Sequence, residues 1–302
     1  MRKRVVSADE RIFRELARGI YLEGLATDPM TCSVWFSDVV GGGIYGLDAD
    51  GISTVFDADR LWTGGVLLNA CGAVLSSGEG GIRWNHPRSG HSGWLITELN
   101  GEPVNGINEM APDRCGGMFF GTVDIENVKQ AKAPRSTQIW HLAADRRLRL
   151  VCDEIGFSNG MAFDQQRYRL YCNDSFKCTW VFDVQKDFTL TNRQKFADKT
   201  DADGMALDSE GNVWITGFAS RAISRYAADG TELELFNTPG GAVTQMRFSG
   251  HDMMDLYINT VPADGGQNLK QGNSMIESKS VLYLTRAPRP GCAAGFTNFV
   301  LL

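Results

Sequence analysis

Four side chains with oxygen donors stand at one phase of a repeated sequence pattern. Asn159 and Asp203 each precede a Gly in two closely similar stretches, and Glu23 and Asn108 hold the corresponding position in two further copies. Two carboxylates that converge in a partly buried space raise each other's pKa, and a bound cation removes that penalty. Oxygen donors without matched His or Cys favour a hard divalent cation: Ca²⁺ first, then Mg²⁺ or Mn²⁺, with Zn²⁺ also able to occupy such a site.

The pattern that carries these residues is a short β-meander. In the stretch from Asp201 to Tyr226, two apolar runs and a third, alternating run are separated by turns rich in Gly. Six copies, the last of them weak, are aligned on phase residues 41, 44, 51, 44 and 40 positions apart: Gly24, Gly65, Glu109, Gly160, Gly204 and Thr244. Copies of about 40–50 residues with three or four strands each are typical of β-propeller blades.

We therefore expect an all-β protein, with residues 1–302 forming a single six-bladed β-propeller domain. Its blades should be four-stranded antiparallel sheets around a central channel. A helical solenoid of the same period is excluded, because turns interrupt every run before a helix of about 10–12 residues can form.

Several segments fall outside the repeat. Arg4 to Leu16, Val281 to Leu284 and Phe296 to Leu302 are expected to complete a shared blade that closes the ring. The insertion from Asp124 to Ser136 is rich in Lys, Ala and Pro, which favours an exposed loop or a short helix. The polar, Gly-rich segment from Gly265 to Met275 is expected to form a long loop.

The first strand of each blade lines the channel of a propeller, so equivalent positions form a ring around one axis. The ring position precedes each phase residue and is occupied by Glu23, Gly64, Asn108, Asn159, Asp203 and Val243. Any one Asn or Asp before a Gly is more often an ordinary turn former. Several oxygen donors in phase within one propeller favour a metal site at the mouth where the inner strands begin.

Composition excludes several other classes of function. The formal net charge is −6 and no basic run occurs, so nucleic acid is not an expected partner. No apolar run approaches the roughly 20 residues that span a bilayer, and the N-terminus lacks the apolar core of a signal peptide. The seven Cys form no CxxC pair and are expected to be reduced. We expect a cytoplasmic protein without membrane contact, either a monomer or a small homo-oligomer.

These motifs resemble those of the SMP-30/gluconolactonase/luciferin-regenerating-enzyme family of six-bladed propellers. The resemblance extends from about Glu23 to Phe296 and rests on five segments: Glu23-Gly24-Leu25, Asn108-Glu109, Ser158-Asn159-Gly160, Ala202 to Asp208, and Pro290 to Ala294. The segment around Asp203 is similar to the family's PDGMAxD motif and is the most specific of the five.

The resemblance implies one catalytic divalent metal held by Glu23, Asn159 and Asp203. It also implies hydrolysis of a lactone, usually a sugar lactone. In such a reaction the metal acts as a Lewis acid on the lactone carbonyl oxygen, and Asp203 is expected to be the general base that accepts a proton from water. Asn108 is a neighbour that binds metal, water or substrate.

Two departures from the family pattern bear on the small-molecule lactone that the protein is expected to bind. Members that act on sugar lactones often have an Arg two residues before the Asn–acid pair, where this chain has Gly106, and the acid is Glu109 rather than the more common Asp. Around the second and third blades the chain instead offers Trp62, Trp84 and Trp94. Asn108, Glu109 and Gly106 are expected at the substrate, which should be bulkier or less polar than an ordinary aldonolactone.

Three alternatives remain open from the sequence. The same site could hydrolyse an aryl ester or a phosphotriester. The propeller could be a binding platform that a metal only stabilises. It could also resemble the metal-free strictosidine-synthase propellers, although the Glu, Asn and Asp donors argue against that interpretation.

Overall fold

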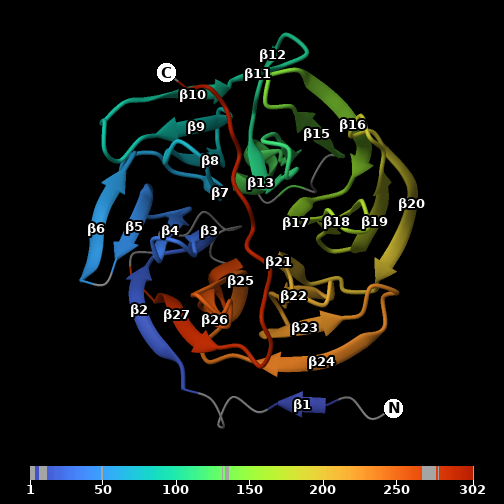
Figure 1. Cartoon of the computed structure of the whole chain (residues 1–302). Helices are drawn as coiled ribbons and strands as arrows, with labels where there is room; N and C mark the ends of the chain where they lie inside the picture. Colours follow the sequence, from blue (N-terminus) through green and yellow to red (C-terminus); the bar gives the residue numbers. More distant parts are fainter. Residues whose placement is uncertain are drawn as a thin grey trace.

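The computed structural model describes residues 4–6, 12–48, 50–130, 132, 136–266, 277 and 279–301. They form six four-stranded antiparallel sheets arranged radially around a centre (Figure 1), so the expected six-bladed propeller is confirmed. The inner strands of successive blades contact one another in cyclic order, and the sixth contacts the first. No helix within these described residues is long and apolar enough to cross a membrane.

The blades follow one another along the chain, and each runs from an inner to an outer strand. The strands of blades 1 to 3 are β3 (Leu22–Asp28), β4 (Ser33–Asp38), β5 (Ile44–Asp48) and β6 (Gly51–Phe56); β7 (Thr63–Leu68), β8 (Val74–Gly78), β9 (Ile82–Asn85) and β10 (Ser92–Ile96); and β13 (Ile107–Pro112), β14 (Met118–Thr122), β15 (Thr137–Leu142) and β16 (Leu148–Ile155). A small hairpin, β11 (Glu98–Leu99) and β12 (Glu102–Pro103), joins blades 2 and 3.

The strands of blades 4 to 6 repeat this order. They are β17 (Ser158–Asp164), β18 (Arg169–Asp174), β19 (Cys178–Val184) and β20 (Leu190–Ala197); β21 (Ala202–Leu207), β22 (Val213–Gly217), β23 (Ala222–Tyr226) and β24 (Glu232–Asn237); and β25 (Ala242–Ser249), β26 (Asp255–Val261), β27 (Ser280–Arg286) and β2 (Arg14–Gly19). A short strand, β1 (Arg4–Val6), adds in parallel to the outer edge of blade 5.

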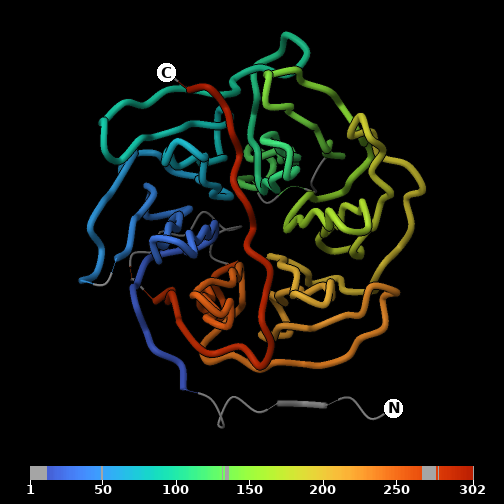
Figure 2. The backbone as a smooth tube through the Cα atoms, viewed as in Figure 1, coloured from blue at the N-terminus to red at the C-terminus, as the bar shows by residue number. Residues whose placement is uncertain are grey.

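The expected closure of the ring by the N-terminal stretch holds for β2, which is the outer strand of blade 6 and pairs with β27, but Arg4–Val6 lies on blade 5 instead. The expectation that Phe296 to Leu302 shares blade 6 is wrong. Residues 287–301, which we call the strap, leave β27 and cross the centre of the face shown in Figures 1 and 2. They do so because backbone groups at the ends of several inner strands accept them: Cys292 N donates to Leu207 O at 2.9 Å, and Thr297 N donates to Leu68 O at 3.0 Å.

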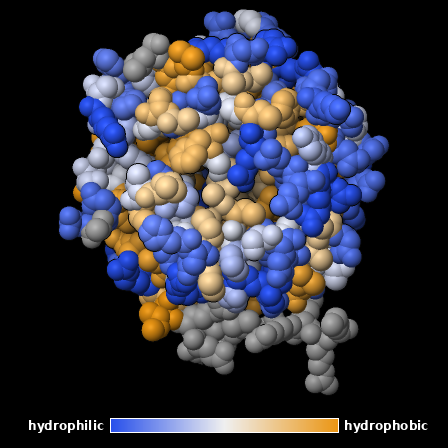
Figure 3. Space-filling model, viewed as in Figure 1, coloured by the Kyte–Doolittle hydropathy of each residue, from blue (hydrophilic) through white to orange (hydrophobic). Residues whose placement is uncertain are grey.

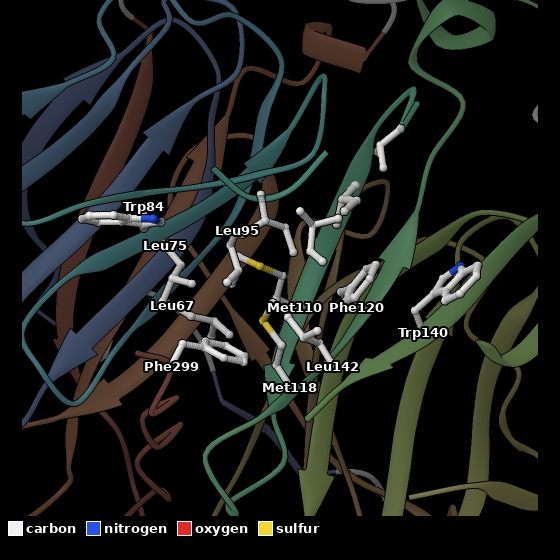
Figure 4. Close-up of a cluster of buried hydrophobic side chains, with 14 of the residues drawn as sticks. Leu67, Leu75, Trp84, Leu95, Met110, Met118, Phe120, Trp140, Leu142 and Phe299 are labelled. Carbon is white, nitrogen blue, oxygen red and sulfur yellow. The ribbon is translucent and has the colours of Figure 1, made fainter. Parts of the chain in front are cut away.

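The core lies between the blades and also beneath the strap. The cluster between blades 2 and 3 includes Leu67, Trp84, Met110 and Phe120, and Phe299 of the strap packs into it (Figure 4). On the face that the strap crosses, Figure 3 shows apolar and near-neutral residues in the middle and hydrophilic residues predominating at the right-hand rim. Because Phe299 is buried in the cluster between blades 2 and 3, it anchors the end of the strap to the propeller.

The insertion in blade 3 contains a short helix, α1 (Ile125–Lys129), as expected. Asp124 caps it by accepting a hydrogen bond from Asn127 N at 3.1 Å. The helix is not merely exposed, because Ile125 is buried. Residues 131 and 133–135 of the insertion, and all but residues 265–266 of the expected loop from Gly265 to Met275, lie outside the described residues.

Candidate active site

Each inner strand is interrupted at the level of the ring position. The register with the second strand shifts between Leu22 and Leu25 in blade 1, and between Ser158 and Met161 in blade 4. Equivalent shifts occur in the other four blades. A β-bulge places an extra residue in one strand and re-aims its side chains. The bulges therefore turn the ring residues into the channel at the mouth where the inner strands begin, which we call the entry mouth.

The bulges align the six blades and correct one assignment. In blades 1 to 5 they enclose Glu23, Gly64, Asn108, Asn159 and Asp203, as the sequence phase predicts. In blade 6 the residue between Val243 and Gln245 is Thr244, so Thr244 rather than Val243 occupies the ring. Two residues, Thr244 and Gln245, stand between the pairs Val243–Thr260 and Met246–Ile258, as in the other blades. The weak sequence match of this copy therefore misplaced its alignment by one position.

In four blades a Gly follows the ring residue, and the neighbouring inner strand approaches it so closely that a side chain there would not fit. A Cβ atom on Gly160 would collide with the carbonyl oxygen of Asp203, and one on Gly24 would collide with that of Gly64. Second-strand side chains complete these contacts: Asn173 Nδ2 donates to Asp203 O at 2.7 Å. The Gly of each motif thus allows the ring to close tightly, and the preceding residue points into the channel.

Glu23, Asn159 and Asp203 come together in this ring, although they belong to three different blades. Asp203 and Asn159 are buried, and Asn159 Nδ2 donates to Ser175 Oγ at 3.3 Å. Burial raises the pKa of Asp203 well above its ordinary value, and the charge of Glu109 adds to this effect, while a hydrogen bond with Asn159 opposes it. Burial, and then the charge of Asp203, likewise raises the pKa of Glu23.

The donor set of this ring fits a hard divalent cation. Oδ1 of Asp203 is buried and has no hydrogen-bond partner among the described residues. An unsatisfied buried carboxylate oxygen is costly, and a cation held between Asp203 and Glu23 would satisfy it and reduce their repulsion. No three Asp, Glu, His or Cys side chains are grouped as metal ligands in the described part of the chain. The third protein donor would therefore be the amide oxygen of Asn159.

Asn108 lies in the same ring in blade 3. Its Nδ2 donates to Ser158 O at 2.9 Å, which links blade 3 to blade 4 and fixes the amide plane. This bond leaves the oxygen end of the amide for an interaction with water, metal or substrate. The contact that Asn108 makes with a ligand stays a prediction.

Immediately beyond the ring lies a level that is mostly glycine. Its members follow the ring residues and are Gly24, Gly65, Glu109, Gly160, Gly204 and Gln245. The two long side chains, Glu109 and Gln245, belong to opposite blades, and Gln245 Nε2 donates to Glu109 Oε2 across the channel. Both residues are buried. This bridge forms a floor beneath the ring, and the four glycines leave space for it.

A positively charged side chain, Arg247, supports this floor from the next level. Arg247 is buried, donates to Gln245 Oε1 at 2.6 Å, and has its Nη2 3.8 Å from Glu109 Oε1. Burial raises the pKa of Glu109, and the charge of Arg247 opposes that rise. Between Arg247 and the strap remains a cavity of about 40 Å³, lined in part by Ala111, Ala206 and Cys292. It has room for about one water molecule, so we expect ligands to reach the ring from the entry mouth.

The structure separates the three Trp residues that were expected near the substrate. Trp62 lies at the start of β7, at the entry mouth. Trp84 is wrong as a substrate contact, because its side chain is buried between blades 2 and 3. Trp94 is 42% exposed on the outer strand β10, where its ring lies 5.0 Å from the guanidinium of Arg60. Gly106 also lies at the entry mouth, where Val123 N donates to its carbonyl.

Sequence reasoning missed three residues of the channel. Tyr21 is buried at the entry mouth, and burial followed by the charges of Glu23 and Asp203 raises its pKa. It stands two positions before a ring residue, a phase that the repeat could have supplied. Gln245 and Arg247 belong to the weakest copy of the repeat, whose alignment was shifted by one residue.

Comparisons with known proteins agree with this architecture. The family model for the SMP-30/gluconolactonase/LRE-like region matches residues 22–262. The pentonolactonase XacC of Haloferax volcanii is 28% identical over 174 residues, covering 55% of this chain and 57% of that protein. The match thus spans less than two thirds of that relative's length.

A longer match is found with the 6-deoxy-6-sulfogluconolactonase of Pseudomonas putida, which is 24% identical over 280 residues, 87% of this chain and 92% of that protein. Among solved structures, a calcium-binding regucalcin of Agrobacterium tumefaciens superimposes with a TM-score of 0.75 at 19% identity, with 95% of each chain covered. At that identity the structural likeness concerns the fold alone.

Proposed function

The chain belongs to the SMP-30/gluconolactonase/LRE-like family, and on that premise we propose that it is a metal-dependent hydrolase that opens the ring of a lactone. The observation that carries the proposal is the buried, unpartnered Oδ1 of Asp203 in a ring that also holds Glu23 and Asn159. The lactonase relatives support this reaction class, and the calcium-binding regucalcin supports Ca²⁺ as the first candidate ion. Mg²⁺, Mn²⁺ and Zn²⁺ remain candidates by donor chemistry.

Glu23, Asn159 and Asp203 would hold the cation at the entry mouth. When bound, the cation supplies Lewis acidity toward the lactone carbonyl oxygen and positive charge that keeps Asp203 ionised. Asp203 would then accept a proton from the attacking water as the oxygen of that water bonds to the carbonyl carbon. The ring C–O bond breaks, the departing alkoxide takes up a proton, and the product is a hydroxy acid.

The neighbouring residues would orient the substrate rather than react with it. Asn108, fixed through its Nδ2, would direct its amide oxygen to the substrate or to water. Glu109 would act from the floor, because its carboxylate is already engaged by Gln245. The small residue at Gly106 supports a substrate other than an ordinary aldonolactone, because it brings no hydrogen-bonding side chain to this wall.

The test is a pH-stat assay on protein stripped with EDTA and reloaded with Ca²⁺, Mg²⁺, Mn²⁺ or Zn²⁺. The panel should hold aldonolactones, alkyl and aryl lactones, an aryl ester and a phosphotriester. We expect lactone hydrolysis that depends on added metal, and a loss of at least about 1,000-fold in kcat for Asp203→Asn. The matched control is Asp198→Asn, five residues away, where an exposed carboxylate pairs with Lys195 Nζ at 2.8 Å.

Residual activity of Asp203→Asn within about tenfold of the parent protein would rule out its role as the base. Tight metal binding without hydrolysis of any panel member would indicate instead a propeller that a metal only stabilises. Preference for the aryl ester or the phosphotriester would keep the site and change the substrate.

A further inference from the structure

One level of the channel lies just outside the ring, on the entry side. We call it the collar, and it consists of the six residues Tyr21, Trp62, Gly106, Phe157, Asp201 and Ala242. In five blades the carbonyl of the collar residue accepts a hydrogen bond from the backbone N–H of the residue that follows the second strand. The donor–acceptor distances are 2.8 Å for Val39–Tyr21, 3.1 Å for Glu79–Trp62, 2.9 Å for Val123–Gly106, 3.0 Å for Ser175–Phe157 and 2.8 Å for Phe218–Asp201. In blade 6, Ala242 pairs with Val261 in the same register. The six positions are therefore equivalent in space.

Aromatic side chains occupy the collar in three blades. Tyr21 is buried in a cluster with Ala242 and Val261, and Trp62 packs against this cluster. Phe157 is half-buried and meets Phe176 edge to face, with ring centroids 5.9 Å apart. Half-buried aromatic rings near a catalytic centre offer apolar area at little conformational cost.

The two collar positions without a bulky side chain in blades 3 and 5 add no free polar group. At Gly106 a Cβ atom would collide with Cδ1 of Ile125, so the Ile125 side chain, from helix α1, already fills that space. In blade 5 the Asp201 carboxylate accepts hydrogen bonds from Lys199 Nζ at 3.0 Å and from Ser220 N at 2.6 Å. Its charge is therefore satisfied within the blade.

We propose that the collar is the specificity site for an apolar substituent, an alkyl chain or an aryl ring, carried on the lactone ring. The inference rests on the proposed lactonase function and names the class of substrate for the same site. Trp62 and Phe157 flank the channel from blades 2 and 4, and Ile125 closes the gap between them in blade 3. The charged groups nearest these rings are already paired: Lys129, whose Nζ lies 5.6 Å from the Trp62 ring, with Glu79 at 2.6 Å, and Asp201 with Lys199. A polyhydroxylated substituent would therefore lose hydrogen bonds to water without full replacement, which disfavours sugar lactones.

The test is the dependence of kcat/KM on chain length in a series of γ-lactones, from γ-butyrolactone through the butyl-substituted to the hexyl-substituted ring, with D-glucono-δ-lactone as the polar reference. Burial of one methylene corresponds to about a fourfold gain. We expect kcat/KM to rise twofold to fourfold per methylene, as an order of magnitude for a partly exposed collar, and to exceed that for the sugar lactone.

Two variants locate the effect. Trp62→Ala and Phe157→Ala should each lower the ratio of kcat/KM for the hexyl-substituted over the unsubstituted lactone by about tenfold, the order expected when contact with two or three methylenes is lost. Trp94→Ala is the matched control, because Trp94 is exposed on the outer strand of blade 2. Circular dichroism would verify folding, and either variant alone is sufficient if the other does not fold.

The outcomes separate this inference from the function on which it rests. Lactone hydrolysis without any dependence on chain length, or with the sugar lactone preferred, would overturn the collar proposal and leave the lactonase function intact. A chain-length dependence that Trp94→Ala removes and the two collar variants do not would also overturn it. No hydrolysis of any lactone with any metal would overturn the proposed function, and the collar's role with it.

Discussion

Replacement of Arg247 by Met should reveal how strongly the floor of the channel depends on one buried charge. Arg247 is the cation nearest to Glu109 in the floor, with Nη2 3.8 Å from Oε1. It also donates to Gln245 Oε1 at 2.6 Å and to the Met205 carbonyl at 3.0 Å. Met retains most of the apolar stem and removes the charge and all of these donors.

The magnitude follows from what the substitution leaves behind. Removal of one partner of a buried ion pair costs about 3–5 kcal/mol, because the other charge stays buried without compensation. Gln245 Oε1 keeps a hydrogen bond from its neighbour Met246 N at 3.0 Å, so loss of the hydrogen bond from Arg247 to Gln245 adds little to this cost. We expect Arg247→Met to lower the free energy of unfolding by about 4 kcal/mol at pH 8.

The penalty should depend on pH with a definite sign. Burial already raises the pKa of Glu109, and loss of the opposing Arg247 charge raises it further. At a pH below the unfolded pKa of about 4.3, both states hold the proton and no charge is buried. As pH rises above that value, the unfolded state releases its proton while the folded state resists, so stability falls. The variant should therefore be least penalised near pH 5 and most penalised near pH 8.

Urea unfolding followed by fluorescence at pH 5 and pH 8 measures this effect. The double variant Glu109→Gln with Arg247→Met buries no net charge and should recover at least half of the loss. Arg169→Met is the control, because Arg169 is partly exposed and 3.7 Å from its partner Asp183, so its loss should cost less than about 1 kcal/mol. A cost of Arg247→Met below about 1 kcal/mol at both pH values would refute the reasoning.

Two further predictions concern the cation and the strap. Because the pKa values of Glu23 and Asp203 are raised in the cation-free protein, protons should compete with the ion for these carboxylates. The affinity for Ca²⁺, measured by calorimetry, should therefore increase from pH 5 to pH 8. An affinity that is constant over this range would contradict the proposed ligands. Asn69 holds Phe299 of the strap through both ends of its amide, at 3.1 Å and 2.8 Å, so Asn69→Ala should cost about 2–3 kcal/mol and speed hydrogen exchange at Phe299. Asn298→Ala, at an exposed strap position, should do neither, and equal effects of the two substitutions would show that Asn69 is not the anchor.

The blade architecture could be predicted because its signals are local and repeated. Each copy specifies its own strands and turns, and a β-bulge near Gly24, Gly160 or Gly204 needs only the residues around it. Six local solutions then close into a ring, which places Glu23, Asn159 and Asp203 at one level. The expectation that they converge follows from periodicity alone, without knowledge of any long-range contact.

The weakest copy shows where that reasoning ended. Its sequence matches the other copies poorly, so the alignment placed Val243 in the ring, whereas the structure places Thr244 there. Because of that shift, Gln245 was not recognised as the counterpart of Glu109. The two residues are 136 positions apart, and they meet only because their blades face each other across the channel.

The sequence by itself determined the number of blades, the order of their strands and the ring of oxygen donors, since all of these follow from a period of about 40–50 residues. Only the tertiary structure decided the depth and boundaries of the channel: the Glu109–Gln245 floor, the strap that crosses the far face, Ile125 in the space beside Gly106, and Trp84 in the core rather than at the mouth. These features depend on which side chains fill space between distant segments. Packing of that kind has no period, so no repeat in the sequence encodes it.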